Sequence, residues 1–147
     1  MTHPFEIEQE ITLPAGPEQV WDAITNPELT KQYFYGSVVE STFEPGAPYL
    51  SASEDGSMRF AEGEILEADP PRLLRHTWRT LWVEGAADEA SRVTWEIEPQ
   101  EDGTSKLTLV HDHLDTAPVT AASVAGGWSY VLSGLKTLVE TGEPLAV

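Results

Sequence analysis

Two histidines stand at positions where strand periodicity would turn them toward the protein interior. His76 and Trp78 are two residues apart in one apolar run, as are Leu109 and His111 in another. Residues two apart share one face of a β-strand, so each histidine is expected on a buried face. An inward imidazole can donate or accept a hydrogen bond, share a proton or bind a metal.

Large apolar side chains are expected to surround these histidines. Trp95 lies in a third alternating run, and Trp128 begins the apolar stripe of the last segment of the chain. Such a surface, with few polar tips, suits a pocket for an apolar small molecule. The candidate ligand-binding residues are His76, Trp78, Trp95, Leu109, His111, Trp128 and Leu132. The alternative is plain core packing for the tryptophans and, for each histidine, a neutral ring satisfied by one neighbouring group.

Other kinds of chemistry have weaker support in the sequence. A metal site would need a third ligand, and His113 joins His111 on one side only if the strand continues through His113. The chain has no cysteine. Ser129 does not lie in a GlyxSerxGly turn and is expected on a helix surface. We therefore expect no metal and no cofactor, and no catalytic residue is identified.

Glu62 and Glu64 are the carboxylates whose orientation the sequence leaves open. They flank Gly63, and parity with Phe60 and Leu66 would carry both side chains inward. A bulge near Gly63 would reverse that orientation, and we expect the bulge. If either glutamate faced the interior, burial would raise its pKa and make it a possible general base.

Composition narrows the class of protein and its partners. The 147 residues suit one domain, and eight basic against 25 acidic residues give a net charge of −17. This charge repels nucleic acid and anionic membranes, unless Arg72, Arg75 and Arg79 form a local basic patch. The first ten residues do not resemble a secretory signal, and no run is apolar enough to span a bilayer. A cytoplasmic location is expected, and the oligomeric state stays open.

Periodicity and turn residues predict an α+β order of elements. Two short helices are expected after the first strand, with Pro17 and Pro27 at their starts and Asn26 as the second cap. A long helix is predicted within 126–145, covering at least 127–140 and ending near Gly142. The segment 82–90 is expected to be a mobile loop. The predicted strands are 5–13, 37–43, 48–52, 59–67, 73–80, 92–98 and 106–112.

Four motifs, in order along the chain, resemble the START-like (SRPBCC) superfamily. They are VWDAITNPELTKQYF, an AspProProArgLeu turn before a strand containing HisThrTrp, ThrLeuValHis after a glycine turn, and GlyTrpxxxLeuxxLeu in the closing helix. More narrowly, they resemble the activators of heat-shock-protein-90 ATPase, a branch also grouped with polyketide cyclase-like proteins. The resemblance implies one START-like domain over 1–147 with a helix-grip fold, in which a curved antiparallel sheet wraps around the C-terminal helix and leaves a cavity.

Three functions follow as hypotheses. The first is a small-molecule binding protein that holds a hydrophobic or aromatic ligand between the sheet and the helix, because it requires nothing beyond the residues seen. The second is a cyclase- or hydrolase-like enzyme using His76, His111 or Glu64 as acid or base. The third, implied by the resemblance, is a stress-response co-chaperone with a heat-shock ATPase as partner. For the first, replacing His111 by leucine is expected to alter ligand preference more than stability.

Overall fold

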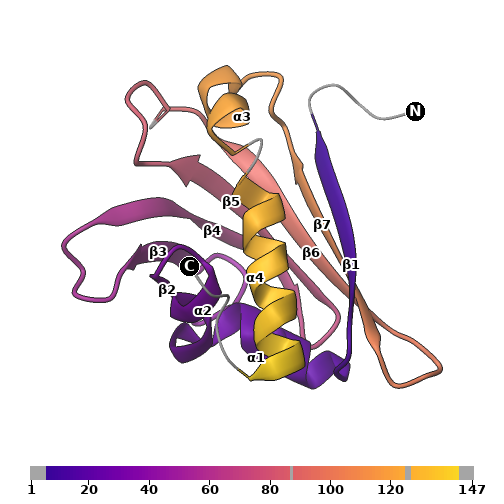
Figure 1. The fold of residues 1–147 in the computed structure, drawn as a ribbon. Coiled ribbons are helices and arrows are strands. Elements are labelled where there is room, and N and C mark those ends of the chain that lie inside the picture. Colours follow the sequence, from indigo (N-terminus) through magenta and orange to yellow (C-terminus); the bar gives the residue numbers. More distant parts are fainter. Residues whose placement is uncertain (1–5, 87, 125–126, 143–147) are drawn as a thin grey trace.

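A seven-stranded antiparallel sheet curls around one long helix. The computed structural model describes residues 6–86, 88–124 and 127–142. The strand order is β1-β7-β6-β5-β4-β3-β2, and helix α4 (Gly127–Thr141) lies across the concave face (Figure 1). This confirms the predicted α+β helix-grip fold. The strands are β1 (Ile7–Leu13), β2 (Ser37–Glu40), β3 (Pro48–Ser53), β4 (Arg59–Asp69), β5 (Leu73–Thr80), β6 (Ser91–Pro99) and β7 (Ser105–Asp112).

The alternating runs put their apolar residues on the concave face, as predicted. The register pairs Leu74 with Trp95 and Trp95 with Leu109, so three neighbouring strands present one continuous apolar surface. All of these inward residues are buried, which follows from the two-residue period of a strand. The buried set from β5, β6 and β7 is Leu74, His76, Trp78, Val93, Trp95, Ile97, Leu107, Leu109 and His111.

Both short helices begin where the sequence predicts. Helix α1 (Pro17–Thr25) and helix α2 (Pro27–Tyr33) each start with proline, which needs no amide donor in the first turn. The Asn26 side chain accepts a hydrogen bond from the Glu28 amide, 3.0 Å away, and so caps α2. These helices lead into β2, which α2 covers at one edge of the sheet.

The helix α4 buries the predicted stripe against the sheet. Its buried residues include Trp128, Val131, Leu132, Leu135 and Leu138, whereas Val139 is only partly buried. The helix ends at Thr141, and Gly142 follows with a φ of 78°, the left-handed conformation expected of a helix stop. The remainder of the predicted run, at 126 and 143–145, lies outside the described residues.

Three element predictions need correction. The strand predicted over 37–43 ends at Glu40, because Phe43 has a φ of 57° and cannot continue a strand. The first strand begins at Ile7, and Phe5 lies outside the described residues. Helix α3 (Pro118–Val124) was not predicted. Its short, small-residue sequence has no clear apolar period, although Pro118 is a helix-start signal.

Strand β4 is bulged, but not at the predicted glycine. Its pairing register shifts at Phe60, against β3, and at Leu66, against β5. At Gly63 a side chain would collide with the carbonyl of Thr77, so only glycine fits. The Glu64 amide there donates to Thr77 Oγ1, 2.8 Å away, instead of making a ladder bond. A bulge at Phe60 re-aims that side chain toward the concave face.

The two glutamates of β4 face away from the interior, as expected, but the bulges lie at Phe60 and Leu66 and not at Gly63. Glu62 lies 3.6 Å from Arg79 on the convex face, and Glu64 is exposed. The inward positions of β4 are Ala61 and Ile65, both buried. Neither glutamate is therefore placed to act as a buried general base.

Residues 82–86 and 88–90 of the predicted loop are irregular, and they contact α3. Ala86 is fully buried, and the Glu89 carboxylate accepts hydrogen bonds from the Thr120 and Val119 amides at 2.8 and 3.3 Å. Burial would raise the pKa of Glu89, but these bonds outweigh it and lower the pKa. A carboxylate at a helix start satisfies amides that have no partner within the helix.

Candidate functional site

An open pocket of about 400 Å³ lies where the ends of β3, β4 and β5 meet α3 and the first turns of α4. These elements surround the upper half of α4 in Figure 1. None of the described residues that line the pocket is charged. The lining consists of Phe34, Tyr35, Ser37, Ser51, Phe60, Trp78, Trp82, Ser123, Val124, Gly127, Trp128 and Val131.

Aromatic rings form the inner wall of this pocket. The rings of Trp78 and Trp128 lie 5.3 Å apart between centroids, and Phe34 lies 6.5 Å from Trp78 and 5.7 Å from Trp128. All three residues are buried, with exposed fractions of 6% or less. Aromatic walls of this kind bury large apolar area and favour flat ring ligands.

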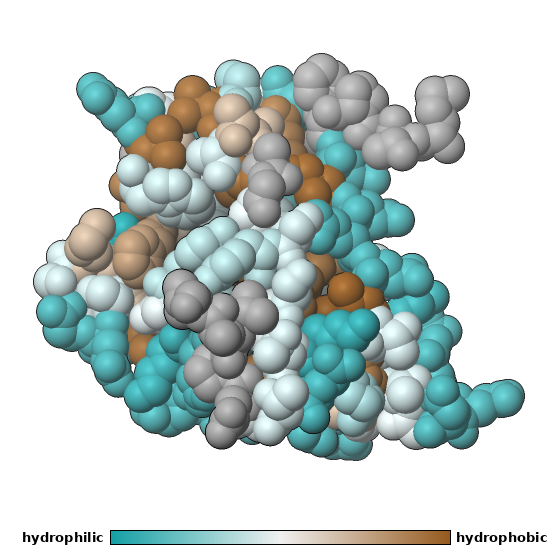
Figure 2. Space-filling view, in the orientation of Figure 1, coloured by the Kyte–Doolittle hydropathy of each residue, from teal (hydrophilic) through white to brown (hydrophobic). Residues whose placement is uncertain are grey.

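More exposed aromatic residues border the opening. Tyr35 and Tyr130 stack with centroids 4.9 Å apart, and Trp82 packs edge-on against Trp78 at 6.4 Å. The exposed fractions of Tyr35 and Trp82 are 57% and 45%. Figure 2 shows hydrophobic residues reaching the surface around α3, whereas hydrophilic residues cover the edge along β1. Tyr35 and Trp82 also line the pocket, so these exposed aromatic rings extend its wall to the surface.

Three serines line the pocket, and the hydroxyls of two of them donate hydrogen bonds to nearby backbone carbonyls. Ser37 donates to the Phe34 carbonyl at 2.6 Å, and Ser123 donates to the Thr120 carbonyl at 3.0 Å. Ser51 is only 1% exposed, yet its hydroxyl has no hydrogen-bond partner among the described residues. Ser51 therefore keeps a donor and two acceptor positions available toward the pocket.

His76 lies behind this pocket with both ring nitrogens bonded to protein. Its Nδ1 lies 2.9 Å from the Thr77 carbonyl, and its Nε2 accepts from the Trp95 indole at 3.2 Å. The carbonyl can only accept, so we assign the proton to Nδ1. The Tyr49 ring stacks on the imidazole at 3.9 Å. Burial lowers the pKa of His76 to about 4, so the ring is neutral at pH 7.

His111 is satisfied in the same manner by a second tryptophan. Its Nδ1 accepts from the Trp128 indole at 3.0 Å, so the proton is on Nε2, which donates to Ser91 Oγ at 2.7 Å. Ser91 Oγ in turn donates to the Trp78 carbonyl at 3.2 Å. Burial, and then the nearby His76, lower the pKa of His111 to about 3.

The His111–Ser91 pair resembles a nucleophilic dyad only in its distance. A general base must present an unprotonated nitrogen to the serine hydroxyl. Here the Trp128 indole occupies Nδ1, which leaves the proton on the nitrogen that faces Ser91. Ser91 is also not among the residues that line the pocket. The pair therefore stabilises the interior and is not arranged for acyl transfer.

The predicted site residues divide into two groups. Trp78 and Trp128 line the pocket, and the structure brings them into contact as expected from strand parity and helical phase. The others are buried behind these rings or farther along α4, and direct ligand contact by them stays a prediction. This second group is His76, Trp95, Leu109, His111 and Leu132.

Sequence reasoning missed most of the pocket lining. Ser51 gave no signal, because a serine in a short strand is usually solvated. Phe60 reaches the pocket only through an unpredicted bulge, and Val124 belongs to the helix that was missed. Proline at the start of α3 was the one signal that could have placed Val124.

The structure places His113 apart from the inward face of β7. The strand β7 ends at Asp112, and His113 has a φ of 62°, so His113 does not continue the face of His111. Within residues 6–86, 88–124 and 127–142 no group of three or more His, Asp or Glu side chains could hold a metal ion. In the same ranges no helix is long and apolar enough to cross a membrane.

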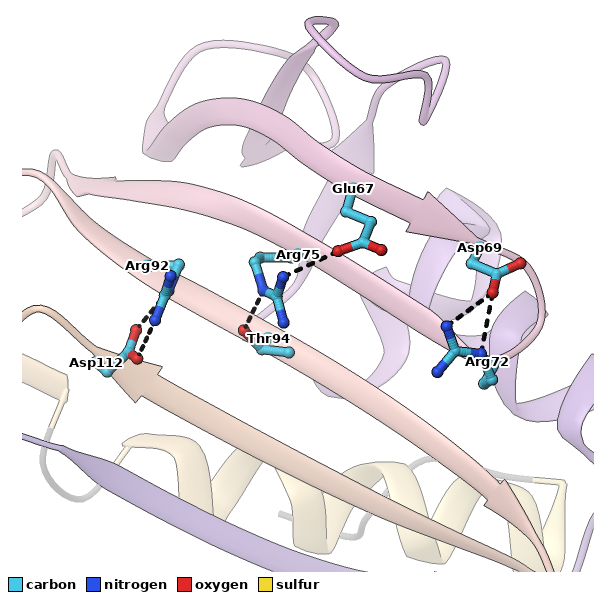
Figure 3. Close-up of polar contacts among 7 residues, drawn as sticks. All are labelled: Glu67, Asp69, Arg72, Arg75, Arg92, Thr94 and Asp112. Atoms are coloured by element: carbon cyan, nitrogen blue, oxygen red, sulfur yellow. Dashed lines mark hydrogen bonds and ion pairs between the residues drawn. The ribbon is translucent and has the colours of Figure 1, made fainter.

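The convex face of the sheet carries ion pairs instead of a basic patch. Arg92 makes two hydrogen bonds to Asp112, at 2.9 and 2.6 Å, and Arg75 bonds to Glu67 at 2.9 Å (Figure 3). Arg72 bonds to Asp69 at 2.8 and 3.0 Å. With Arg79 beside Glu62, each arginine of the suspected patch has a carboxylate neighbour. The absence of nucleic-acid and membrane binding stays a prediction.

The comparison that decides the family covers most of the chain. Residues 14–140 match the family model described as Activator of Hsp90 ATPase homolog 1-like protein. The chain belongs to this family. The match agrees with the START-like resemblance of the sequence, and the extension of one domain over 1–147 stays a prediction. No curated protein shows significant similarity to this family member.

Solved structures share the fold of this Activator of Hsp90 ATPase homolog 1-like chain. CalU16 from Micromonospora echinospora is 25% identical, with a TM-score of 0.72, over 95% of this chain and 76% of that one. DynU16, from the dynemicin biosynthetic locus, is 22% identical with a TM-score of 0.78, over 97% of this chain and 49% of that one. An HSP90 activator from Plasmodium falciparum is 20% identical with a TM-score of 0.70, over 95% and 98%.

Proposed function

We propose that this protein binds an aromatic or largely apolar small molecule in the pocket beside α4. The observation that carries the proposal is the uncharged wall of Phe34, Trp78 and Trp128 around an open volume of about 400 Å³. Pockets of roughly 300–1,000 Å³ with apolar walls and few polar groups are typical of small-molecule sites. Apolar contact would supply most of the affinity, at about 25 cal/mol per Å² buried before ordering costs.

The two histidines are proposed to position the pocket walls. Each buried indole donor needs an acceptor, and His111 provides one for Trp128 while Thr80 provides one for Trp78 at 2.9 Å. His76 does the same for Trp95. These bonds hold the rings in one orientation, so the ligand would meet a preorganised wall, which lowers the cost of binding.

The proposal can be tested with N-phenyl-1-naphthylamine, a neutral probe whose fluorescence rises in apolar surroundings. We expect saturable binding and energy transfer from tryptophan to the probe, because Trp78 and Trp128 would lie beside it. Val131→Phe adds bulk at the lining and should raise the probe's Kd at least about tenfold, since overpacked sites cannot close around a ligand without strain.

A matched variant controls for general disturbance of the helix. Val139 lies two turns farther along α4, is partly buried and is not among the described lining residues, so Val139→Phe should leave the probe's Kd within about twofold. Thermal unfolding of both variants checks that they are folded. No saturable binding to the unmodified protein, or equal effects of the two variants, would contradict the proposal.

Family membership supports a second proposal, a co-chaperone that acts on a heat-shock ATPase. The supporting observation is the match over 14–140 to the Activator of Hsp90 ATPase homolog 1-like model. The measurement is the ATPase rate of HSP90 from the same host with and without this protein. Stimulation by both the unmodified protein and the Val131→Phe variant would assign that role to a surface other than the pocket, whereas no stimulation would contradict it.

A further inference from the structure

We infer that Ser51 selects the class of ligand, a neutral aromatic compound carrying a hydroxyl or carbonyl group, in preference to an aromatic acid. This inference rests on the proposed small-molecule function and adds the polar group by which the pocket would distinguish ligands. It assigns the hydrogen-bonding role to strand β3 and not to either histidine.

The position of Ser51 follows from local strand geometry. Ser51 pairs with Val39 of β2 and Ala61 of β4, so its backbone is held on both sides in the sheet. The register shift beside it leaves Phe60 unpaired, and both Ser51 and Phe60 line the pocket. A hydroxyl on a strand that is paired on both sides is held more firmly than one on a loop, which favours selectivity.

An inventory of the polar atoms singles out this hydroxyl. The indoles of Trp78 and Trp128 donate to Thr80 and His111, and the other two lining serines donate to backbone carbonyls. The Tyr35 hydroxyl donates to the Gly127 carbonyl, 3.4 Å away. Ser51 is 1% exposed and has no such partner among the described residues. The Ser51 hydroxyl borders the open pocket and its hydrogen-bonding positions are not used by protein, so a ligand oxygen can bond to it directly and gain affinity over a ligand that leaves it unpaired.

The charge distribution disfavours an anionic ligand. The described lining contains no lysine, arginine or histidine, and the whole chain has a net charge of −17. The start of α4 contributes a partial positive charge of roughly half a unit, which does not replace a cationic partner. A carboxylate would therefore lose its hydration in an apolar pocket without an ion pair, whereas a phenol or ketone needs only one hydrogen bond.

Three ligands of the same ring size test the inference by equilibrium dialysis at pH 7: naphthalene, 2-naphthol and 2-naphthoate. 2-Naphthol should bind about 3- to 10-fold more tightly than naphthalene, as expected for one neutral hydrogen bond. 2-Naphthoate should bind at least about tenfold more weakly than 2-naphthol. This comparison uses the unmodified protein and does not depend on whether a variant folds.

The Ser51→Ala variant then identifies the group responsible. It should remove the advantage of 2-naphthol and leave naphthalene binding within about twofold. Ser133→Ala, the same change on the exposed side of α4, should alter neither. An unchanged ratio in Ser51→Ala, or naphthoate bound as tightly as naphthol, would overturn this inference while leaving the pocket proposal intact. Failure of all three ligands to bind would overturn both.

Discussion

The interior between the sheet and α4 has two parts, which differ in whether their polar side-chain atoms have hydrogen-bond partners within the protein. In the closed part, around His76, Trp95 and His111, every ring nitrogen has a protein partner. In the open part, the pocket at the start of α4, aromatic rings border free volume and Ser51 has no described partner. The closed part can therefore stabilise and position, whereas the open part retains surface and a hydroxyl for binding.

The largest effect of a single substitution is expected from a cavity in the closed part. Leu135 is fully buried under the sheet, so Leu135→Ala should lower the free energy of unfolding by about 2 to 5 kcal/mol. Denaturant midpoints with an unchanged slope would measure this loss. Leu66→Ala is the matched control, because Leu66 is 42% exposed and its loss should change stability by less than about 0.5 kcal/mol. Equal losses would mean that burial does not distinguish the two sites.

The next effect concerns pH and the two neutral histidines. The folded pKa values are about 4 for His76 and about 3 for His111, below the unfolded value of 6.5. Between pH 6.5 and pH 4 the unfolded chain therefore binds more protons than the folded chain. Stability is therefore fully present above about pH 6.5 and falls as pH decreases toward 4. Two such groups give a slope of up to about 3 kcal/mol per pH unit within this window. Urea unfolding at pH 6.5, 5.5 and 5 would measure it, and a flat profile would contradict the burial of neutral rings.

A smaller loss of stability should follow from removing one hydrogen-bond acceptor at the boundary between the two parts. His111→Leu leaves the buried Trp128 donor without its partner, which should cost about 1 to 3 kcal/mol and weaken probe binding through the misplaced indole. The sequence alone predicts a larger effect on ligand preference than on stability, and that stays a prediction. The indole bond adds an expected loss of stability, so both quantities should be measured in His111→Leu.

The His111→Asn variant sharpens this test. An asparagine oxygen can take the place of Nδ1, so His111→Asn should retain more stability and more probe binding than His111→Leu. Thermal unfolding and probe titration would be measured for both. If the two variants were equally stable, the indole bond would not be the cause of the loss.

The smallest effect is expected outside both parts, on the convex face. Arg92 and Asp112 form a two-point ion pair, with side chains 33% and 17% exposed. Asp112→Asn should lower the free energy of unfolding by about 0.5 to 1 kcal/mol, since partly solvated pairs contribute little. Probe affinity should not change, because the pair lies on the opposite face from the pocket. A loss as large as that of Leu135→Ala would show that the ion pairs, and not the interior, dominate stability.

Much of the fold was predictable because it depends on local periodicity. The alternation in 92–98 and 106–112 identified the buried faces, and the prolines and Asn26 identified both early helices. Helix α3 and the shortened β2 were not predicted. Their ends depend on a left-handed Phe43 and on contacts with the 82–90 segment, which no local pattern in the sequence displays.

The sequence by itself determined the family, the inward faces and the aromatic character of the interior. Only the tertiary structure decided which polar atoms meet. His76 and His111 become satisfied because the register brings Trp95 near one and the packing of α4 brings Trp128 near the other. Ser51 is left without a described partner by the same packing. Hydrogen bonds between elements depend on positions to within a few tenths of an ångström, and periodicity places a side chain only on a face.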